Sequence, residues 1–350
     1  MTRLAERLGL ALPLLQAGMG AVAGAELCAA VSRAGAGGTL ALYKEPPARA
    51  ARLVREVAAA TGRPFGVNVI PEVTGPAACL DQLRAVLPEL PRGAFVTSFG
   101  LPDADAARAV RAAGHPLVIQ VGTVMEAGTA LGRGAAVLVL QGTEAGGHLL
   151  GRLPVRDLLA GVRARHPHAV LAVAGGIATG GDLADAIARG ADGAMAGTLF
   201  IPVAESTAHP LFKQRVTEAV ADDTLITSLF RIGWPHRPHR VLGNPLTIAG
   251  ERAPTTFIAT TRVDGREYPI PRYSAAAPGN GTTGRIEEMA MYCGRSCTRV
   301  TGRHPAAVTV ARLSQEYESA RGLRTASPGP ANGIPARTSG SASRPQSQER

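Results

Sequence analysis

Aromatic residues are scarce in this 350-residue chain: Phe, Trp and Tyr together make up 4 %, with a single tryptophan. Proteins that bind single-stranded nucleic acid stack bases on several aromatic side chains, so this scarcity argues against such a platform. The formal net charge is +10, yet only Lys44 and Lys213 are lysines, and five of the 37 basic residues fall in the last 30 positions. This arginine bias, beside many Ala, Gly and Pro, indicates genomic composition, and we predict no nucleic-acid partner.

Long hydrophobic runs are also missing, because no uninterrupted apolar stretch approaches 18 residues. A transmembrane helix is therefore not expected. The first ten residues, "MTRLAERLGL", lack the apolar core and cleavage signal of a secretory leader. We expect a cytoplasmic protein without a membrane partner.

Cysteine is rare, with four residues, and the motifs of several enzyme classes are absent. Cys293 and Cys297 lie four apart in "YCGRSC", and only His304 adds a nearby soft ligand, which is too few for a structural zinc site. The sequence contains no HExxH, CxxC or GxSxG motif, so a zinc protease or serine hydrolase is not supported. We predict no metal and leave the roles of the two cysteines open.

Eight short apolar runs recur along the first 200 residues and alternate with helix-like stretches, several of which end in glycine, a common C-cap signal. Strands that are apolar on both faces and alternate with helices indicate a parallel sheet. Eight such units predict an α/β fold, a (β/α)8 TIM-type barrel. A doubly wound sheet is the alternative, although no GxGxxG motif follows the first run. The runs are residues 12–19, 37–43, 64–70, 93–99, 116–122, 135–142, 169–176 and 193–200.

The regular alternation stops near residue 201. We predict a barrel over residues 1–204, then a small, mainly helical lid with closing helices over 205–322, and a disordered low-complexity tail over 323–350. Within the lid, "GRIEEMAMYCGRSCTRV" and "PAAVTVARLSQEYESA" are expected to be helices. In the Pro- and Arg-rich segment "WPHRPHR" (234–240), His236 and His239 are candidates to face a ligand from the lid, and the role of the segment as a whole is left open.

Functional side chains of such a barrel gather at the carboxyl ends of its strands. The last two runs each place glycine where a strand is expected to end, at Gly175-Gly176 and at Gly197, and exposed backbone N–H groups there bind phosphate. The alternative is that these glycines only permit tight turns. The run 135–140 leads into "QGTEAGGH" (141–148), which places His148 at the same end, as a base, a phosphate ligand or an ordinary surface residue. Glu144 is expected to cap the next segment, and Gln141 offers an amide to the edge of a heteroaromatic ring.

Together these segments resemble the nitronate monooxygenase family, also called 2-nitropropane dioxygenases, over about residues 10 to 320. "QGTEAGGH" and "AVAGGIATGGDLADAIARGADGAMAGTLF" are the specific parts; "QAGMG", "FGVNVI", "QVGTVMEA" and "RVLGN" add to them. The resemblance implies a TIM-like barrel that holds FMN without a covalent bond, beneath a smaller lid domain.

The resemblance also implies roles for particular residues. His148 matches the catalytic histidine. The positions matched to FMN are Met19, Gly20, Asn68, Gln141, Gly146, Gly175, Gly176, Met195, Ala196, Gly197 and Thr198. Three places depart from the family pattern: Gly18 stands where proline is usual, Met195 where glutamine is common, and Leu149-Leu150-Gly151 where an Arg-Gly sequence frequently follows the histidine.

The implied function is FMN-dependent oxidation of a small alkyl nitronate, or of the parent nitroalkane, by O2 to a carbonyl compound and nitrite. An FMN- and NAD(P)H-dependent enoyl-acyl-carrier-protein reductase is the alternative that shares fold and motif. A barrel that binds flavin or another phosphate ligand without turnover is the alternative from a different class. The sequence leaves the natural substrate, the use of NAD(P)H and the oligomeric state undetermined.

Overall fold

Eight parallel strands form the barrel predicted from the sequence. The computed structural model describes residues 1–42, 44–235 and 237–326. The strands follow the order β1-β9-β8-β6-β5-β4-β3-β2, and each lies inside one of the eight predicted runs. Their bounds are β1 Leu14–Gln16, β2 Gly38–Ala41, β3 Phe65–Val69, β4 Phe95–Phe99, β5 Leu117–Val121, β6 Val137–Gln141, β8 Leu171–Ala174 and β9 Gly193–Ala196.

The first and last strands of that order meet and close the ring. Gln16 N donates to Gly37 O at 2.9 Å, and Gly37 N donates to Leu14 O at 2.8 Å. The side chain of Gln16 extends the contact, since its Oε1 accepts from Thr39 N at 2.9 Å. The closed ring excludes the doubly wound sheet.

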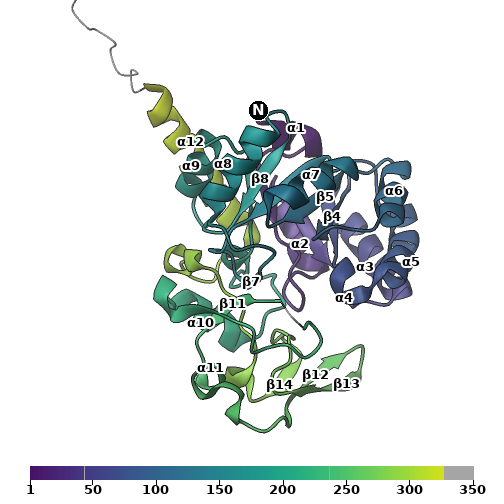
Figure 1. Cartoon of the computed structure of the whole chain (residues 1–350), viewed down its shortest axis with the longest axis vertical. Helices are drawn as coiled ribbons and strands as arrows, with labels where there is room; N and C mark the ends of the chain where they lie inside the picture. Colours follow the sequence, from purple (N-terminus) through teal and green to yellow (C-terminus); the bar gives the residue numbers. More distant parts are fainter. Residues whose placement is uncertain (43, 236, 327–350) are drawn as a thin grey trace, which may run out of the picture.

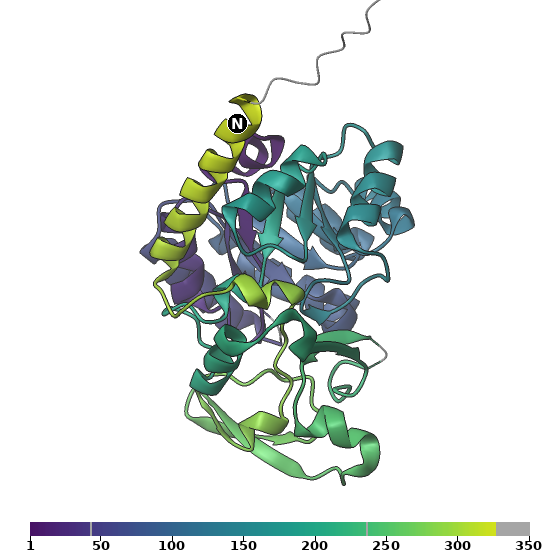
Figure 2. The ribbon, with the colours of Figure 1, turned by 90° about the vertical axis from the view of Figure 1, so that its left-hand side faces the viewer.

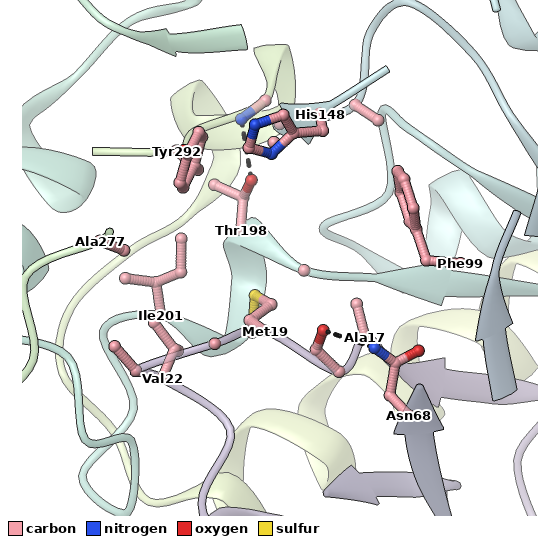
Figure 3. Close-up of a pocket in the computed structure, with 18 of the residues that line it drawn as sticks. Ala17, Met19, Val22, Asn68, Phe99, His148, Thr198, Ile201, Ala277 and Tyr292 are labelled. Carbon is pink, nitrogen blue, oxygen red and sulfur yellow. Dashed lines mark hydrogen bonds between the residues drawn. The ribbon is translucent and has the colours of Figure 1, made fainter. Parts of the chain in front are cut away.

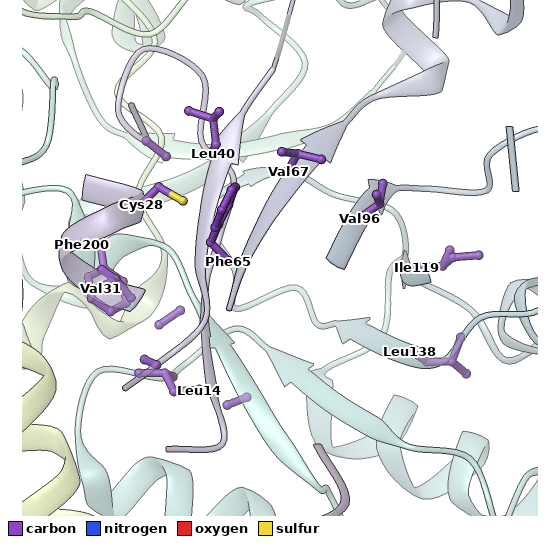
Figure 4. Close-up of a cluster of buried hydrophobic side chains, with 14 of the residues drawn as sticks. Leu14, Cys28, Val31, Leu40, Phe65, Val67, Val96, Ile119, Leu138 and Phe200 are labelled. Carbon is purple, nitrogen blue, oxygen red and sulfur yellow. The ribbon is translucent and has the colours of Figure 1, made fainter. Parts of the chain in front are cut away.

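Helices surround the barrel and pack on the outward side chains of its strands (Figures 1 and 4). Along β6, Leu138 and Leu140 belong to this outer layer, while Val137 and Val139 point into the barrel interior. This alternation explains why the strand sequences are apolar on both faces. The helices are α2 Ala25–Arg33, α3 Pro47–Ala60, α4 Pro71–Thr74, α5 Pro76–Val86, α6 Ala104–Ala112, α7 Val124–Gly132, α8 Val155–Arg165 and α9 Gly180–Ala188.

Two terminal helices complete the barrel. Helix α1 (Arg3–Leu8) contributes Leu4 and Leu8 to the cluster in the barrel interior and so covers the amino-terminal end of the strands. Helix α12 (Ala306–Ala326) packs beside α9 and α2, where the eighth helix of the ring belongs (Figure 2). The lid is therefore inserted between the last strand and its helix.

The lid differs from the mainly helical prediction. It contains helices α10 (Pro210–Glu218) and α11 (Pro245–Ala249), and also two three-stranded antiparallel sheets. One sheet joins β10 (Thr224–Thr227) and β11 (His239–Leu242) to β7 (Gly147–His148) of the barrel loop. The other consists of β12 (Phe257–Val263), β13 (Arg266–Pro271) and β14 (Thr282–Gly284). The β12–β13 hairpin turns at Asp264 and Gly265, with φ of 48° and 78°, as a two-residue type I′ turn requires.

The predicted helix in "GRIEEMAMYCGRSCTRV" is wrong as well. The segment forms only short 3-10 turns, η5 (Ile286–Glu288) and η6 (Arg295–Arg299). Between these turns its backbone bonds to the barrel: Gly294 N donates to Thr198 Oγ1 at 2.9 Å, and Arg295 N donates to Glu144 O at 3.0 Å. The predicted terminal helix is confirmed as α12, which runs to Ala326; the tail beyond it lies outside the described residues.

None of the helices described is both long and apolar enough to span a membrane. The domain boundary at residue 204 and the disordered tail remain predictions.

Candidate active site

The carboxyl ends of the barrel strands open into one cavity of about 370 Å³ beneath the lid. That volume lies within the range of about 300–1,000 Å³ typical of small-molecule sites. All twelve residues selected from the sequence line this cavity. They are Met19, Gly20, Asn68, Gln141, Gly146, His148, Gly175, Gly176, Met195, Ala196, Gly197 and Thr198. In Figure 3, His148 lies across the pocket from Met19, Ala17 and Asn68.

One wall of the cavity is the loop after β1, which lies directly on Asn68 at the end of β3. A Cβ atom added to Gly18 would overlap the side chain of Asn68, so only glycine permits this approach. Asn68 is buried, and its Oδ1 accepts from Thr97 Oγ1 at 2.8 Å. Gly18, found where the family usually has proline, is therefore required by the close approach of Asn68.

The adjacent strands β8 and β9 end in the predicted glycine turns. Gly175 and Gly176 have φ of 116° and 78°, which side chains rarely tolerate. Within the described part of the chain, their amides donate to no other group. The following helix begins at a capping box, in which Thr179 Oγ1 accepts from Asp182 N at 3.1 Å and Asp182 Oδ2 accepts from Thr179 N at 2.9 Å. This cap fixes the start of α9, directly after the two glycines that line the cavity.

Gln141 differs from the expectation that its amide serves a ligand ring. Its Nε2 donates to the His148 carbonyl oxygen at 2.9 Å, and its Oε1 accepts from Leu150 N at 2.8 Å. Both ends of the amide therefore hold the loop that carries His148. The predicted capping role of Glu144 is confirmed, because Glu144 Oε2 accepts from Val155 N, at the start of α8, at 3.0 Å.

The His148 imidazole is buried in the wall of the cavity. Its Nε2 has no hydrogen-bond partner among the described residues. Burial, with smaller contributions from the neighbouring His239 and Arg237, lowers the pKa of His148 from 6.5 to about 2. The ring is therefore neutral at physiological pH, with an uncommitted nitrogen.

Aromatic side chains that the sequence did not single out surround His148. The Trp234 ring is stacked on the imidazole, with centroids 3.8 Å apart and planes 13° apart. His239 and Tyr292 pack at 5.0 and 5.2 Å. His239, one of two lid histidines considered as ligand contacts, is fully buried and bonds backbone at both ring nitrogens: Phe230 N at 3.3 Å and Arg237 O at 3.0 Å. The other, His236, lies outside the described residues.

The lid presses close to the His148 loop at two glycines. A Cβ on Gly146 would lie 2.6 Å from the backbone of Cys293 and Gly294, so the backbone of the His148 loop contacts the backbone of the lid at this point. Cys293 and Cys297 are buried free thiols hydrogen-bonded to each other, which lowers the pKa of Cys297 to about 7. The described residues contain no group of three or more His, Cys, Asp or Glu arranged to hold a metal ion.

The cavity lining has an uneven chemical character. Its charged members among the described residues are two carboxylates, Glu45 and Glu144, and no lysine or arginine contributes. The wall formed by the lid is largely apolar. It includes Ile201, Phe212, Val263, Ile270 and Ala275.

The sequence matches the family model described as nitronate monooxygenase over residues 1–94 and 80–316. It is 33 % identical over 268 residues to a Mycobacterium tuberculosis protein named (3aS,4S,5R,7aS)-5-hydroxy-7a-methyl-1-oxo-octahydro-1H-indene-4-carboxyl-CoA dehydrogenase, which covers 76 % of this chain and 73 % of that one. The fold is similar to FabK from Thermotoga maritima, with a TM-score of 0.77, 25 % identity and coverage of 93 % of this chain and 99 % of that chain. It is also similar to a nitroalkane oxidase from Streptomyces ansochromogenes, with a TM-score of 0.70, 27 % identity and coverage of 92 % and 100 %. The barrel, its glycine turns and the matched sequence place this chain in the nitronate monooxygenase family.

Proposed function

We propose that this protein is an FMN-dependent enzyme that oxidises small alkyl nitronates, or their parent nitroalkanes, with O2. The carbon–nitrogen double bond of the nitronate is replaced by a carbonyl group, and the nitrogen leaves as nitrite. Two nitronate anions and one O2 molecule contain the atoms and electrons of two carbonyl molecules and two nitrite ions. The observation that carries the proposal is the buried His148, whose imidazole lines the same cavity as the glycine turns of β8 and β9.

The residues present fit FMN. The free amides of Gly175 and Gly176 suit the phosphate, because backbone N–H groups without a side chain form a nest for an anion. Gly197 and Thr198 lie beside them at the end of β9. Met19, Gly20, Asn68, Gly146, Met195 and Ala196 would then border the ring system, and Gln141 would act indirectly by holding the His148 loop. When bound, FMN supplies the electron acceptor that no side chain provides.

His148 would meet the substrate through its imidazole, which lines the cavity. For a neutral nitroalkane, the neutral imidazole accepts the α-proton. For a nitronate, the negative charge beside the ring favours the protonated imidazole and so opposes the burial that lowers the pKa of His148. This charge compensation matters because no lysine or arginine among the described residues lines the cavity.

Nitrite formation and O2 consumption by the FMN-loaded protein test this function. Propionate 3-nitronate is the substrate, with no nicotinamide cofactor added. We expect two nitrite ions per O2 at the simple stoichiometry, and a large loss of turnover in His148→Phe with FMN retained. Absence of nitrite from the FMN-loaded protein would refute the proposal.

An NAD(P)H-dependent enoyl reductase is the second candidate. The apolar lid wall at Ile201, Phe212 and Ile270 favours it, because an acyl chain needs such a surface. NAD(P)H oxidation that depends on an enoyl thioester would identify this activity. Bound flavin without turnover of either substrate would indicate a binding protein instead.

A further inference from the structure

Trp234, the single tryptophan of the chain, belongs to the "WPHRPHR" segment, to which the proposed chemistry assigns no task. Its indole lies between a side chain of the loop that follows β6 and a side chain of a barrel strand. One is His148 of β7, stacked at 3.8 Å, and the other is Phe99 of β4, whose ring meets the indole edge-on with centroids 5.3 Å apart. Trp234 is buried and lines the cavity.

The indole is tied to the barrel through α4, the short helix after β3. Trp234 Nε1 donates to Glu72 Oε1 at 3.2 Å. Arg237 Nε donates to both oxygens of the same carboxylate, at 3.0 and 3.1 Å. On the other side, Leu149 N donates to Pro238 O at 2.8 Å. The segment is therefore attached both to α4 and to the residue that follows His148.

The imidazole itself depends on packing for its orientation. Gln141 holds the backbone of His148, but no described residue forms a hydrogen bond to either nitrogen of its ring. The face-to-face contact with Trp234 is the closest of its three aromatic contacts, compared with 5.0 Å for His239 and 5.2 Å for Tyr292. Trp234 therefore covers one face of the ring and limits its rotation.

We propose that Trp234 is a positioning residue for His148, and that Glu72 and Arg237 hold the indole in place. The inference rests on the proposed function for its effect on turnover, since His148 is the group that meets the substrate there. The indole holds the imidazole in one orientation in the cavity wall and shields it from water.

The test uses the FMN-loaded protein and two independent measurements. Trp234→Leu removes the stack, whereas Trp234→Phe keeps an aromatic ring. We expect kcat/KM for propionate 3-nitronate to fall about 10- to 100-fold in Trp234→Leu and only a few-fold in Trp234→Phe, because small misplacements of a catalytic group have effects of this size. FMN content and the far-ultraviolet circular dichroism spectrum should be unchanged in both variants.

The second measurement does not require turnover. Nitrogen-15 NMR of the histidine rings, assigned with His148→Phe, follows the protonation of His148 between about pH 5 and pH 8. We expect no titration in the wild type and a titration within this window in Trp234→Leu, where water reaches the ring. The charged or titratable groups facing His148 are His239 and Arg237, with Tyr292 beside it and Glu72 behind the indole; all remain in these variants.

Glu72→Gln tests the anchor, with Glu267→Gln as its matched control. Glu267 also pairs with an arginine of the lid, Arg262 at 2.7 Å, but both side chains are exposed and neither residue lines the cavity. We expect Glu72→Gln to shift the His148 titration in the direction of Trp234→Leu and Glu267→Gln to leave it unchanged. Trp234→Leu with an unaltered His148 titration would overturn the inference, even if nitronates prove not to be the substrate. Absence of nitronate turnover in the wild type, with the titration shifted as expected, would refute only the proposed function.

Discussion

The side-chain amide of Gln141 bridges the loop that carries His148, donating to the His148 carbonyl oxygen at 2.9 Å and accepting from Leu150 N at 2.8 Å. The last residue of β6 thus fixes the first residue after the glycine turn. The two residues are seven positions apart, and the glycine-rich loop between them leaves the barrel and folds back onto Gln141.

Gln141→Met should lower both stability and turnover. The substitution leaves the His148 carbonyl and the Leu150 amide buried without partners, at a cost of roughly 1–3 kcal/mol for each group. Urea unfolding and steady-state kinetics measure the two effects. Gln82→Met is the matched control, since Gln82 Nε2 also holds two carbonyl oxygens, of Leu42 and Glu45, both at 2.8 Å, in the loop after β2 instead of the loop that carries His148. Equal losses of turnover in both variants would contradict a specific role for Gln141.

Stability should depend on pH through His148. The unfolded chain binds a proton at this residue near pH 6.5, whereas the folded chain does so only near pH 2, so unfolding takes up a proton between these values. The contribution of neutral His148 to stability is therefore complete above pH 6.5 and is lost as the pH falls from 6.5 toward 2. His148→Phe keeps an aromatic ring and should remove about 2 kcal/mol of the decrease between pH 8 and pH 5. Parallel pH profiles of unfolding free energy for wild type and variant would show that His148 is not buried as a neutral ring.

A side chain at Gly176 should weaken FMN binding in addition to its effect on stability. Gly176 has a φ of 78°, and an added Cβ would meet nothing within 4 Å of the protein itself. Gly176→Ala should therefore cost about 1–2 kcal/mol of backbone strain and, in addition, weaken FMN binding at least tenfold. Gly114→Ala, with a φ of 81° and equally open space behind α6, supplies the same strain without the ligand site. Fluorescence titration with FMN distinguishes them; equal affinities would place the phosphate elsewhere.

Gly18→Ala should push the loop after β1 and the Asn68 side chain apart. Because the new Cβ would overlap the Asn68 side chain, either the loop or β3 has to move, and both line the cavity. We expect a loss of stability of about 1–3 kcal/mol, in the range for overpacking, together with weaker FMN retention. Gly181→Ala in α9 is the control, since its Cβ would make only an ordinary contact, 3.6 Å from Thr179 Oγ1, and should be neutral or slightly stabilising. Normal flavin content in Gly18→Ala would show that this contact does not shape the site.

The barrel was predictable because its strands and helices follow local rules. Each strand such as β6, "VLVLQ", is a short apolar run bounded by glycine, and the alternation with helices leaves few other architectures. The strand ends then identify the site without further information, since a parallel barrel brings them together at one face. For this reason residues as distant as Met19 and Thr198 were expected in one cavity.

The lid was less predictable, for physical reasons. The segment around Cys293 has helical composition, but Gly294 and Arg295 bond to Thr198 and Glu144 of the barrel, which local sequence does not reveal. The β12–β13 hairpin did carry a signal, the Asp264-Gly265 pair between alternating residues, and was missed. The contact between Trp234 and His148 spans 86 positions and depends on the lid geometry, so no motif indicates it.

The absorption spectrum of the FMN-reconstituted protein, recorded before and after anaerobic addition of propionate 3-nitronate, tests the central claim most directly. The account predicts a flavin spectrum that bleaches or changes to that of the one-electron-reduced form, with nitrite released once air is admitted. A flavin spectrum that nitronate leaves unchanged but NAD(P)H bleaches would contradict nitronate oxidation and favour the reductase. No bound flavin after reconstitution would contradict both activities.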